Sequence, residues 1–366
     1  MMWIAIFAIA FLLAIFAAAF LVKRALRFGI PKKLYEKNKW LGIAAAFWPI
    51  LICTPFLFIG VPAFVVVFIH LFFFWVIVDL FAKIIRKIAK KEHTGRYING
   101  FIALALTTIY LTYGWVMAHT VFETGYTLTT EKELGADSLR VVALADLHLG
   151  ITIDGDEFFE ECERINEAEP DVVLIVGDFV DDATERDDMF KACEALGTLN
   201  AKYGVYFSFG NHDRGYFRRE TFTEDELYSA LLENGVNVLT DEVTYINGDV
   251  CIVGREDASD KDRKTAAEIM KGVDRSKYVI VLDHQPNDYD ALACEAPDLV
   301  ISGHTHGGHM FPIGPIGLLM GANDAIYGIE ERGDTSFIVT SGISGWEIPF
   351  KTFTVSEYVV IDISSK

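Results

Sequence analysis

Cysteine is scarce in this sequence. Five cysteines are spread over 366 residues, with no Cys-x-x-Cys pair and no regular spacing. This distribution argues against a cysteine-rich zinc module and against a small scaffold held by disulfides. Internal repeats and low-complexity segments are also missing, so nothing indicates a repeat architecture.

Acidic residues are nearly absent from the first 122 residues, and basic residues are the minority afterwards. The first part holds 13 Lys and Arg against three acids, a balance of +10. Of the 32 basic and 51 acidic residues in the chain, the remainder therefore has 19 and 48, a balance of −29. So abrupt a change in composition predicts a domain boundary near residue 122.

Four apolar segments fill the first part, at residues 3–22, 40–59, 61–78 and 98–118. Each approaches the roughly 20 apolar residues with which a helix crosses a bilayer. The first segment could instead be a secretory signal, but no basic residues precede it and no clear cleavage pattern follows it. We therefore predict a bundle of four transmembrane helices over residues 1–122.

Basic residues cluster in two of the connections between these segments. By the positive-inside rule both connections are cytoplasmic, which places the N-terminus and the acidic part outside the cytoplasm. The protein is thus expected to be a multi-pass cell-membrane protein with an extracytoplasmic domain. The basic residues are Lys23, Arg24, Arg27, Lys32, Lys33, Lys37 and Lys39 in one connection and Lys83, Arg86, Lys87, Lys90, Lys91 and Arg96 in the other.

Two ionisable residues, His70 and Asp79, belong to the third apolar segment or its end. Such groups are costly in a membrane and often mark an ion path. Asp79, however, lies at the end of the segment near Lys83, and a lone histidine is more often packed or hydrogen-bonded. Anchoring is therefore favoured over transport.

Four cysteines fall in the acidic part. Cys162 and Cys193 occupy apolar positions of predicted helices, as buried small hydrophobic residues do. A disulfide among Cys162, Cys193, Cys251 and Cys294 stays open as an alternative.

The acidic part alternates short apolar runs with amphipathic stretches. Helices are predicted over residues 154–170 and 189–199, and from a capping box at Thr223 to Gly235. Residues 243–254 resemble a hairpin that turns at Asn247-Gly248. This order predicts an α/β domain with helix-covered sheets, preceded by a linker over residues 123–138. The remaining predicted strands are residues 139–146, 171–178, 204–211, 278–284, 297–304, 336–342 and 357–363.

Polar side chains follow five of these strands. The carboxyl ends of parallel strands converge on one crevice, and alternate residues of an extended segment point the same way. Glycines before Asp178, Asn211 and His304 allow sharp turns or close approach. The candidates are Asp146 and His148, Asp178, Asn211 with His212 and Asp213, His284, and His304 with His306.

Imidazole and carboxylate groups without thiolate favour divalent ions such as Zn, Mn or Fe. Seven of these candidates, without His212 and Asp213, are counted as ligands, which is too many for one tetrahedral ion. Two ions about 3.5 to 4 Å apart would use them, as in phosphatases and nucleases. Each motif alone is more often a turn or a helix cap. Their joint occurrence at successive strand ends favours a metal site.

These motifs resemble the calcineurin-like metallophosphoesterase superfamily, whose pattern D-x-H, GD-x-x-D, GNH-D/E, H and GH-x-H here reads ADLHLG, GDFVD, GNHD, DHQP and GHTHGG. The resemblance covers about residues 139–360 and is most similar to a membrane-associated phosphodiesterase branch of YkuE/YaeI type. It implies a four-layer α-β-β-α sandwich over the catalytic domain, residues 139–366.

The resemblance also implies residue roles. Asp146, His148 and His306 would bind one metal ion, Asn211, His284 and His304 the other, and Asp178 both. A hydroxide activated by the metals would attack phosphorus. His212 would protonate the leaving oxygen or bind the phosphate, and Asp213 or Asp181 would orient nearby groups. His309 replaces a usual Gln, and either contacts substrate or is a neutral polar replacement.

The expected function is hydrolysis of a phosphodiester or pyrophosphate, with a lipid-linked or cell-envelope substrate favoured by nearness to the bilayer. No nucleic-acid partner is expected. Two alternatives stay open: a phosphomonoesterase with the same site, and a membrane sensor whose outer domain binds metal without turnover. The intact ligand set with His212 argues against the sensor.

Overall fold

The computed structural model describes residues 2–90, 97–215 and 221–366, with side chains from residue 11 onward. The predicted positive charges at Lys91 and Arg96 lie outside the described residues. The chain divides into two compact units, Met1–Tyr113 and Gly114–Lys366. Each unit is described by itself.

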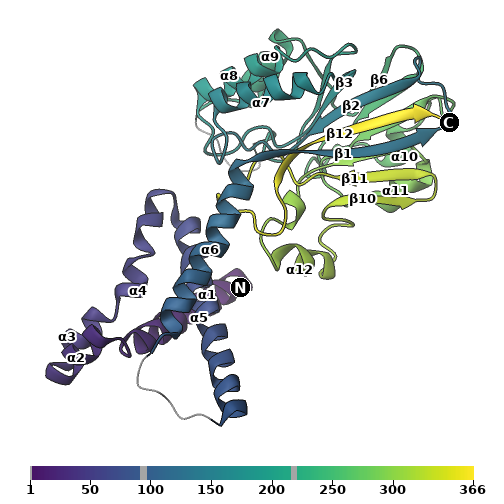
Figure 1. The fold of residues 1–366 in the computed structure, drawn as a ribbon. Helices are drawn as coiled ribbons and strands as arrows, with labels where there is room; N and C mark the ends of the chain where they lie inside the picture. Colours follow the sequence, from purple (N-terminus) through teal and green to yellow (C-terminus); the bar gives the residue numbers. More distant parts are fainter. Residues whose placement is uncertain (1, 91–96, 216–220) are drawn as a thin grey trace. The chain divides into compact units, whose positions relative to one another are not determined.

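The first unit is helical (Figure 1). Its helices are α1 (Met2–Ala25), α2 (Gly29–Lys37), α3 (Lys39–Ala45), α4 (Trp48–Leu51), the 3-10 helix η1 (Thr54–Phe58), α5 (Val61–Ala89) and most of α6 (Asn99–His119).

Two helices among the described residues, α5 and α6, are long and apolar enough to cross a membrane by length and composition. The predicted span at residues 40–59 is wrong as a continuous helix, because it divides into α3, α4 and η1. Pro49 and Pro55 lie at the starts of the last two, where a missing N–H and a fixed φ favour a new helix. The span at residues 3–22 falls in α1, whose first side chains lie outside the described residues. Four transmembrane helices are therefore not supported.

The ionisable residues of α5 have partners inside the first unit. Asp79 pairs with Arg24 at 2.6 Å and accepts hydrogen bonds from Tyr97 and Asn99 at 3.1 and 2.7 Å. His70 Nδ1 lies 2.8 Å from the carbonyl oxygen of Val66. These contacts support the packed alternative over an ion path.

The second unit contains two six-stranded sheets, in the orders β1-β12-β2-β3-β4-β5 and β10-β11-β9-β8-β7-β6. In the first sheet β2 to β5 are parallel, and in the second β7, β8, β9 and β11 are parallel. The strands are β1 (Val121–Thr130), β2 (Ser138–Leu144), β3 (Val172–Val176), β4 (Val205–Ser208), β5 (Val236–Val238), β6 (Glu242–Ile246), β7 (Val250–Gly254), β8 (Tyr278–Leu282), β9 (Leu299–Ser302), β10 (Gly328–Arg332), β11 (Thr335–Val339) and β12 (Ser356–Ser365).

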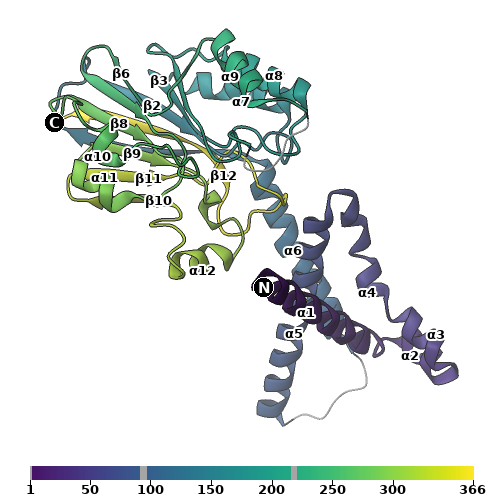
Figure 2. The same cartoon turned by 180° about the vertical axis from the view of Figure 1, so that it is seen from behind.

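Three apolar cores separate the layers of this unit. One packs α7 (Gly155–Glu167), α8 (Arg186–Leu196) and α9 (Glu224–Glu233) on the first sheet. The second lies between the sheets, and the third packs α10 (Ala266–Ile269) and α11 (Tyr289–Glu295) on the other sheet. Figures 1 and 2 show the two helix layers on opposite sides. The predicted mixed α/β fold is confirmed.

Two of these elements were predicted from local sequence signals. Thr223 and Glu226 form the predicted capping box at the start of α9, and residues 243–254 form the antiparallel pair β6–β7 around Asn247 and Gly248. All five cysteines are free; Cys162, Cys193 and Cys251 are buried and Cys294 is exposed.

The segment predicted as a linker, residues 123–138, instead contains most of β1. A single residue separates this strand from the end of α6. The strand pairs in parallel with β12 over its ten residues. Most residues of β1 are polar or half-exposed, because it forms an edge of the sheet. The sequence therefore lacks the apolar run that identified the buried strands.

Candidate metal centre

The predicted ligands come together at the carboxyl ends of β2, β3, β4, β8 and β9. Six of them form groups that could hold a metal ion, and the seventh, Asn211, lines the same pocket of about 480 Å³. Loops from both sheets contribute, so residues up to 160 positions apart face one another, as parallel-strand topology requires.

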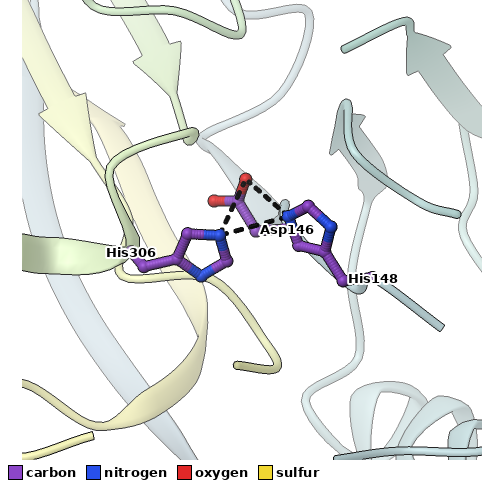
Figure 3. A group of neighbouring side chains, drawn as sticks. All are labelled: Asp146, His148 and His306. Carbon is purple, nitrogen blue, oxygen red and sulfur yellow. Dashed lines mark hydrogen bonds and ion pairs between the residues drawn. The ribbon is translucent and has the colours of Figure 1, made fainter. Parts of the chain in front are cut away.

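One group consists of Asp146, His148 and His306 (Figure 3). The Nε2 atoms of the two histidines are 3.1 Å apart, and each lies 4.0 Å from Asp146 Oδ1. Ligands about 2.0 to 2.1 Å from a tetrahedral ion are about 3.3 Å apart. The triangle of donor atoms is therefore close to the size that one such ion needs.

A second group consists of Asp178, His284 and His304. Two further groups contain His212, one with His148 and Asp178 and the other with Asp181 and Asp182. His284 Nδ1 lies 2.7 Å from the carbonyl oxygen of Val176, which fixes the ring and leaves Nε2 facing Asp178 Oδ2 at 3.0 Å. The same carboxylate oxygen is 3.6 Å from His148 Nε2. Asp178 thus lies between the first group and the second.

The ligand-bearing backbone is strained. Asp146, His148, Asp178, His304 and His306 all have positive φ, between 37° and 69°. Such conformations cost free energy for residues with a side chain and persist where surrounding contacts impose them. The strain directs several side chains into one pocket.

Glycines permit the backbone to close around the carboxylates. A Cβ on Gly210 would overlap Asp178 Oδ1, one on Gly303 would lie 2.7 Å from Asp146 Oδ2, and one on Gly342 would lie 2.6 Å from Asp146 Cβ. The expectation that Gly210 and Gly303 permit close approach is therefore met.

The charge states of Asp178, His304 and His306 suit a metal, whereas His284 is protonated without one. Burial lowers the pKa of His284, but the Asp178 charge outweighs burial and raises it well above its usual value. Burial opposes the charge on Asp178, but the positive charge of His284 outweighs it and holds the carboxyl pKa far below its usual range. Burial lowers the pKa of His304 to about 4 and that of His306 well below its usual value. A carboxylate and neutral imidazoles are the forms that bind metal ions.

Buried polar atoms of the first group also favour a metal. The Nε2 atoms of His148 and His306 face each other at 3.1 Å, and both cannot keep a lone pair there without cost. A divalent cation would satisfy this donor set, so the residues fit the metal ions that the motifs imply.

His212 lies beside the ligands. Its backbone N–H donates to Asp178 Oδ1 at 2.8 Å, and its Nδ1 lies 3.2 Å from Asp181 Oδ1. Asp181 Oδ2 in turn lies 2.8 Å from His148 Nδ1. Burial lowers the pKa of His212, but the Asp181 hydrogen bond and the Asp178 charge outweigh burial and raise it, which favours a ring that can donate a proton.

Asp213 is fully buried and holds backbone rather than reaching the pocket. Its carboxylate accepts hydrogen bonds from the N–H groups of Phe179, Val180 and Gly210, at 2.8, 3.1 and 2.8 Å. These bonds tie the loop after β3 to the loop after β4. Asp213 therefore positions the loops that carry Asp178, Asn211 and His212.

His309 lies away from the pocket that contains Asp178. It is 8% exposed, its Nε2 is 3.2 Å from the carbonyl oxygen of Ile348, and its own carbonyl accepts from Thr352 and Phe353. It lines a second, adjoining cavity.

Two further residues line the pocket, although the sequence motifs gave them no role. Trp346 lies with its ring 6.0 Å from that of His212 and 6.4 Å from that of His306, and Gln285 lies next to Asn211 with its Nε2 3.5 Å from Asn211 Oδ1. Gln285 directly follows His284 and was part of the DHQP motif. Trp346 belongs to no motif, so only the fold reveals it.

A pocket of Asp and His side chains at the strand ends of an α/β sandwich is the arrangement expected of a metal-dependent phosphoesterase. A match to the family described as calcineurin-like phosphoesterase covers residues 139–308. An uncharacterized metallophosphoesterase from Aquifex aeolicus is 31% identical over 66% of this chain and 91% of its own length. This chain belongs to the calcineurin-like metallophosphoesterases.

Two other relatives extend into the first unit. An uncharacterized metallophosphoesterase from Campylobacter jejuni is 27% identical over 81% of this chain and 79% of its own length. A protein from Danio rerio named "transmembrane protein with metallophosphoesterase domain" is 30% identical over 72% of this chain and 62% of its own. Together with α5 and α6, the second name suggests membrane association.

Proposed function

We propose that this chain is a membrane-anchored enzyme that hydrolyses phosphodiester or pyrophosphate bonds in an extracytoplasmic domain. The carrying observation is the position of Asp178, whose carboxylate lies between the two ligand groups while its Oδ1 binds the backbone of His212. This arrangement joins two candidate metal positions to a proton donor.

The two groups support the ligand assignment that the motifs imply. Asp146, His148 and His306 would hold one divalent ion, Asn211, His284 and His304 the other, and Asp178 would contact both. Mn, Zn and Fe all accept such nitrogen and oxygen donors. Bound ions would supply positive charge for the phosphoryl oxygens and activate water as the nucleophile.

The protein's own side chains supply the remaining steps. Asp181 orients the His212 ring and favours its protonated form, so that His212 can give a proton to the leaving oxygen. The buried Asp213 keeps the two loops in register. General acid help of this kind contributes about 10² to 10⁴ in rate.

The pocket lining favours a diester over a monoester. Among the described residues around it there is no Lys and no Arg. A phosphomonoester carries about −1.5 to −2 charge near pH 7, whereas a diester carries about one negative charge, which two metal ions would balance more easily. A second cavity beside the pocket leaves room for a group on the phosphate's other side.

The direct test uses the full chain in detergent with Mn²⁺. Bis(4-nitrophenyl) phosphate should be hydrolysed with a higher kcat/KM than 4-nitrophenyl phosphate, and chelation should abolish both reactions. Faster turnover of the monoester would contradict the proposed specificity. Failure to cleave either substrate with Mn²⁺ or Zn²⁺ present would contradict the proposed enzyme activity.

The orientation has a separate test. Protease added outside intact cells or spheroplasts should cut the catalytic domain, because we place it outside the cytoplasm. Protection in intact cells with cleavage after lysis would overturn that orientation, whatever the substrate.

A further inference from the structure

A second cavity opens directly from the metal pocket. Its volume is about 280 Å³, and it shares the walls His304, His306 and Trp346 with the 480 Å³ pocket. We call this cavity the side groove. A molecule with its phosphorus at the ligand groups can extend into the side groove along continuous walls.

The side groove is built largely from apolar groups. Ile313 of α12 (Ile313–Leu319), Ile326 and Ile348 line it. Its described lining residues include the polar Asn323 and the acidic Glu347 but no Lys and no Arg. Residues 310–322 contain no charged side chain, although the domain around them is strongly acidic. The side groove therefore suits an uncharged apolar group.

Apolar surface continues outward from the side groove. Leu319 is 87% exposed and Met320 79%, and the exposed rings of Phe311 and Phe353 lie 6.3 Å apart. Contiguous exposed apolar surface in a soluble domain marks an interaction site. A polar ligand would gain little from it.

Close backbone packing holds the start of α12, whereas the helix is open at Gly317. A Cβ on Gly314 would lie 2.6 Å from Gly308 Cα, so α12 begins directly against the loop that carries His304 and His306. A Cβ on Gly317, which lines the side groove, would meet nothing within 4 Å. The side groove is thus fixed next to the ligands but open along α12.

The segment of residues 351–356, which follows the lining residue Ile348, is hydrogen-bonded to the end of α6. Lys351 N–H donates to the Gly114 carbonyl at 2.9 Å, and Thr352 N–H donates to the His309 carbonyl at 3.0 Å. Ser356 Oγ donates to the Ala118 carbonyl at 2.9 Å. All these residues belong to the second unit. Because α6 is one of the two helices suited to a membrane, this contact favours a ligand that comes from a bilayer.

We propose that the side groove binds the hydrocarbon chain of an amphiphilic phosphoester whose phosphate lies at the metal pocket. This inference rests on the proposed function and names its substrate class, a lipid phosphoester. The apolar lining, the lack of cations and the shared walls with the ligand groups all fit such a chain.

The test measures binding apart from turnover. The full chain in detergent with Mn²⁺ is titrated calorimetrically with alkylphosphonates from ethyl to octyl, at a fixed detergent concentration. The phosphonate cannot be hydrolysed and keeps the same head group. Affinity should rise with chain length, by up to about fourfold for each methylene that is fully buried, with an increasingly negative heat-capacity change.

A variant with a side chain that fills the side groove is compared with a variant that carries the same side chain elsewhere. In Gly317→Phe the new ring has open space to enter, so the dependence of affinity on chain length should flatten. Gly125→Phe places the same ring at a distant glycine that also has open space, and should keep the wild-type dependence. Ile348→Ser, which makes the lining polar, should weaken octylphosphonate more than ethylphosphonate.

The outcomes separate the two proposals. Equal affinity for ethyl- and octylphosphonate, or an unchanged dependence in Gly317→Phe, would overturn the lipid inference even if diesters are cleaved. A chain-length dependence that Gly317→Phe removes would support it. Absence of diester hydrolysis in the same preparation would instead count against the proposed enzyme activity.

Discussion

The metal pocket and the side groove share three side chains but are confined by the backbone in opposite ways. Around the pocket, Gly210, Gly303 and Gly342 leave no room for a single methyl group beside Asp146 or Asp178. Along the side groove, Gly317 faces open space. Residues at the pocket are thus constrained by contact, as is Gly314 at the start of α12, whereas Gly317 can change without meeting a neighbour.

The largest loss of activity is expected from a substitution in the metal pocket. Asp178→Asn removes the carboxylate between the two ligand groups and should lower kcat/KM for bis(4-nitrophenyl) phosphate by about 10³-fold or more, since metal ions supply several kcal/mol. Bound metal, measured by atomic absorption, should fall as well. Asp225→Asn, on the exposed face of α9, is the control. Full metal content with full activity would refute the role of Asp178.

The next effect separates proton transfer from metal binding. His212→Gln should lower kcat by about 10²-fold with 4-nitrophenyl leaving groups, and by more with unsubstituted phenyl, whose oxygen needs the proton. Metal content should stay unchanged. In the wild type, activity should fall as pH rises through the His212 pKa, which is raised, and the variant should lose this limb. Equal losses for both leaving groups would contradict a proton-donor role.

A single added methyl group sharpens the contrast between confined and open glycines. Gly210→Ala would force a Cβ against Asp178 Oδ1 and should cost about 1 to 3 kcal/mol of unfolding free energy. Gly317→Ala, in open space on a helix, should be neutral or stabilising by a few tenths up to about 1 kcal/mol. Thermal or denaturant unfolding of the full chain measures both. Equal destabilisation would remove the distinction between the two sites.

The smallest effect concerns Lys351, whose fully buried ammonium donates to the carbonyls of Ser341, Gly342 and Val355 at 2.6, 3.0 and 3.3 Å. Lys351→Met leaves these carbonyls unpaired but removes a buried charge, so we expect a net loss of about 1 kcal/mol.

Its pH dependence gives a sharper signature. Burial lowers the pKa of Lys351 from 10.5 to about 7, so between these values the unfolded chain binds more protons than the folded one. Unfolding free energy from this group therefore rises with pH from about 7 to 10.5. Relative to the methionine variant, the wild type should gain stability over that window. A difference that is constant with pH would argue against a depressed pKa.

The clustering of the candidate ligands was predictable from sequence because these residues follow strand ends. Asp146, Asp178 and His284 come directly after, or within two residues of, apolar runs that could only be buried strands, and topology then brings them together. Periodicity could not locate β1 or α12, since neither has a regular apolar face bounded by clear signals. Trp346 belongs to no motif and follows no predicted strand that carries a candidate ligand, so its place in the pocket is known only from the fold.

The apolar first part shows the limit of composition. Residues 40–59 are as apolar as a membrane helix, but Pro49 and Pro55 divide them into short pieces. A prediction from length and hydrophobicity takes no account of the backbone hydrogen bonds that prolines remove. The same residue types in α5, with its only proline at the helix start, form 29 continuous helical residues.

The placement of β12 has a consequence for biosynthesis. This final strand lies between β1 and β2, and its Glu357 accepts a hydrogen bond from Thr124, 233 residues earlier in the chain. During translation β1 has no strand partner until residues 356–365 have been synthesised, because β12 is its neighbour in the sheet. The first sheet can close only after β12 has emerged from the ribosome, so deletion of residues 356–365 should leave a nascent chain that quality-control proteases recognise.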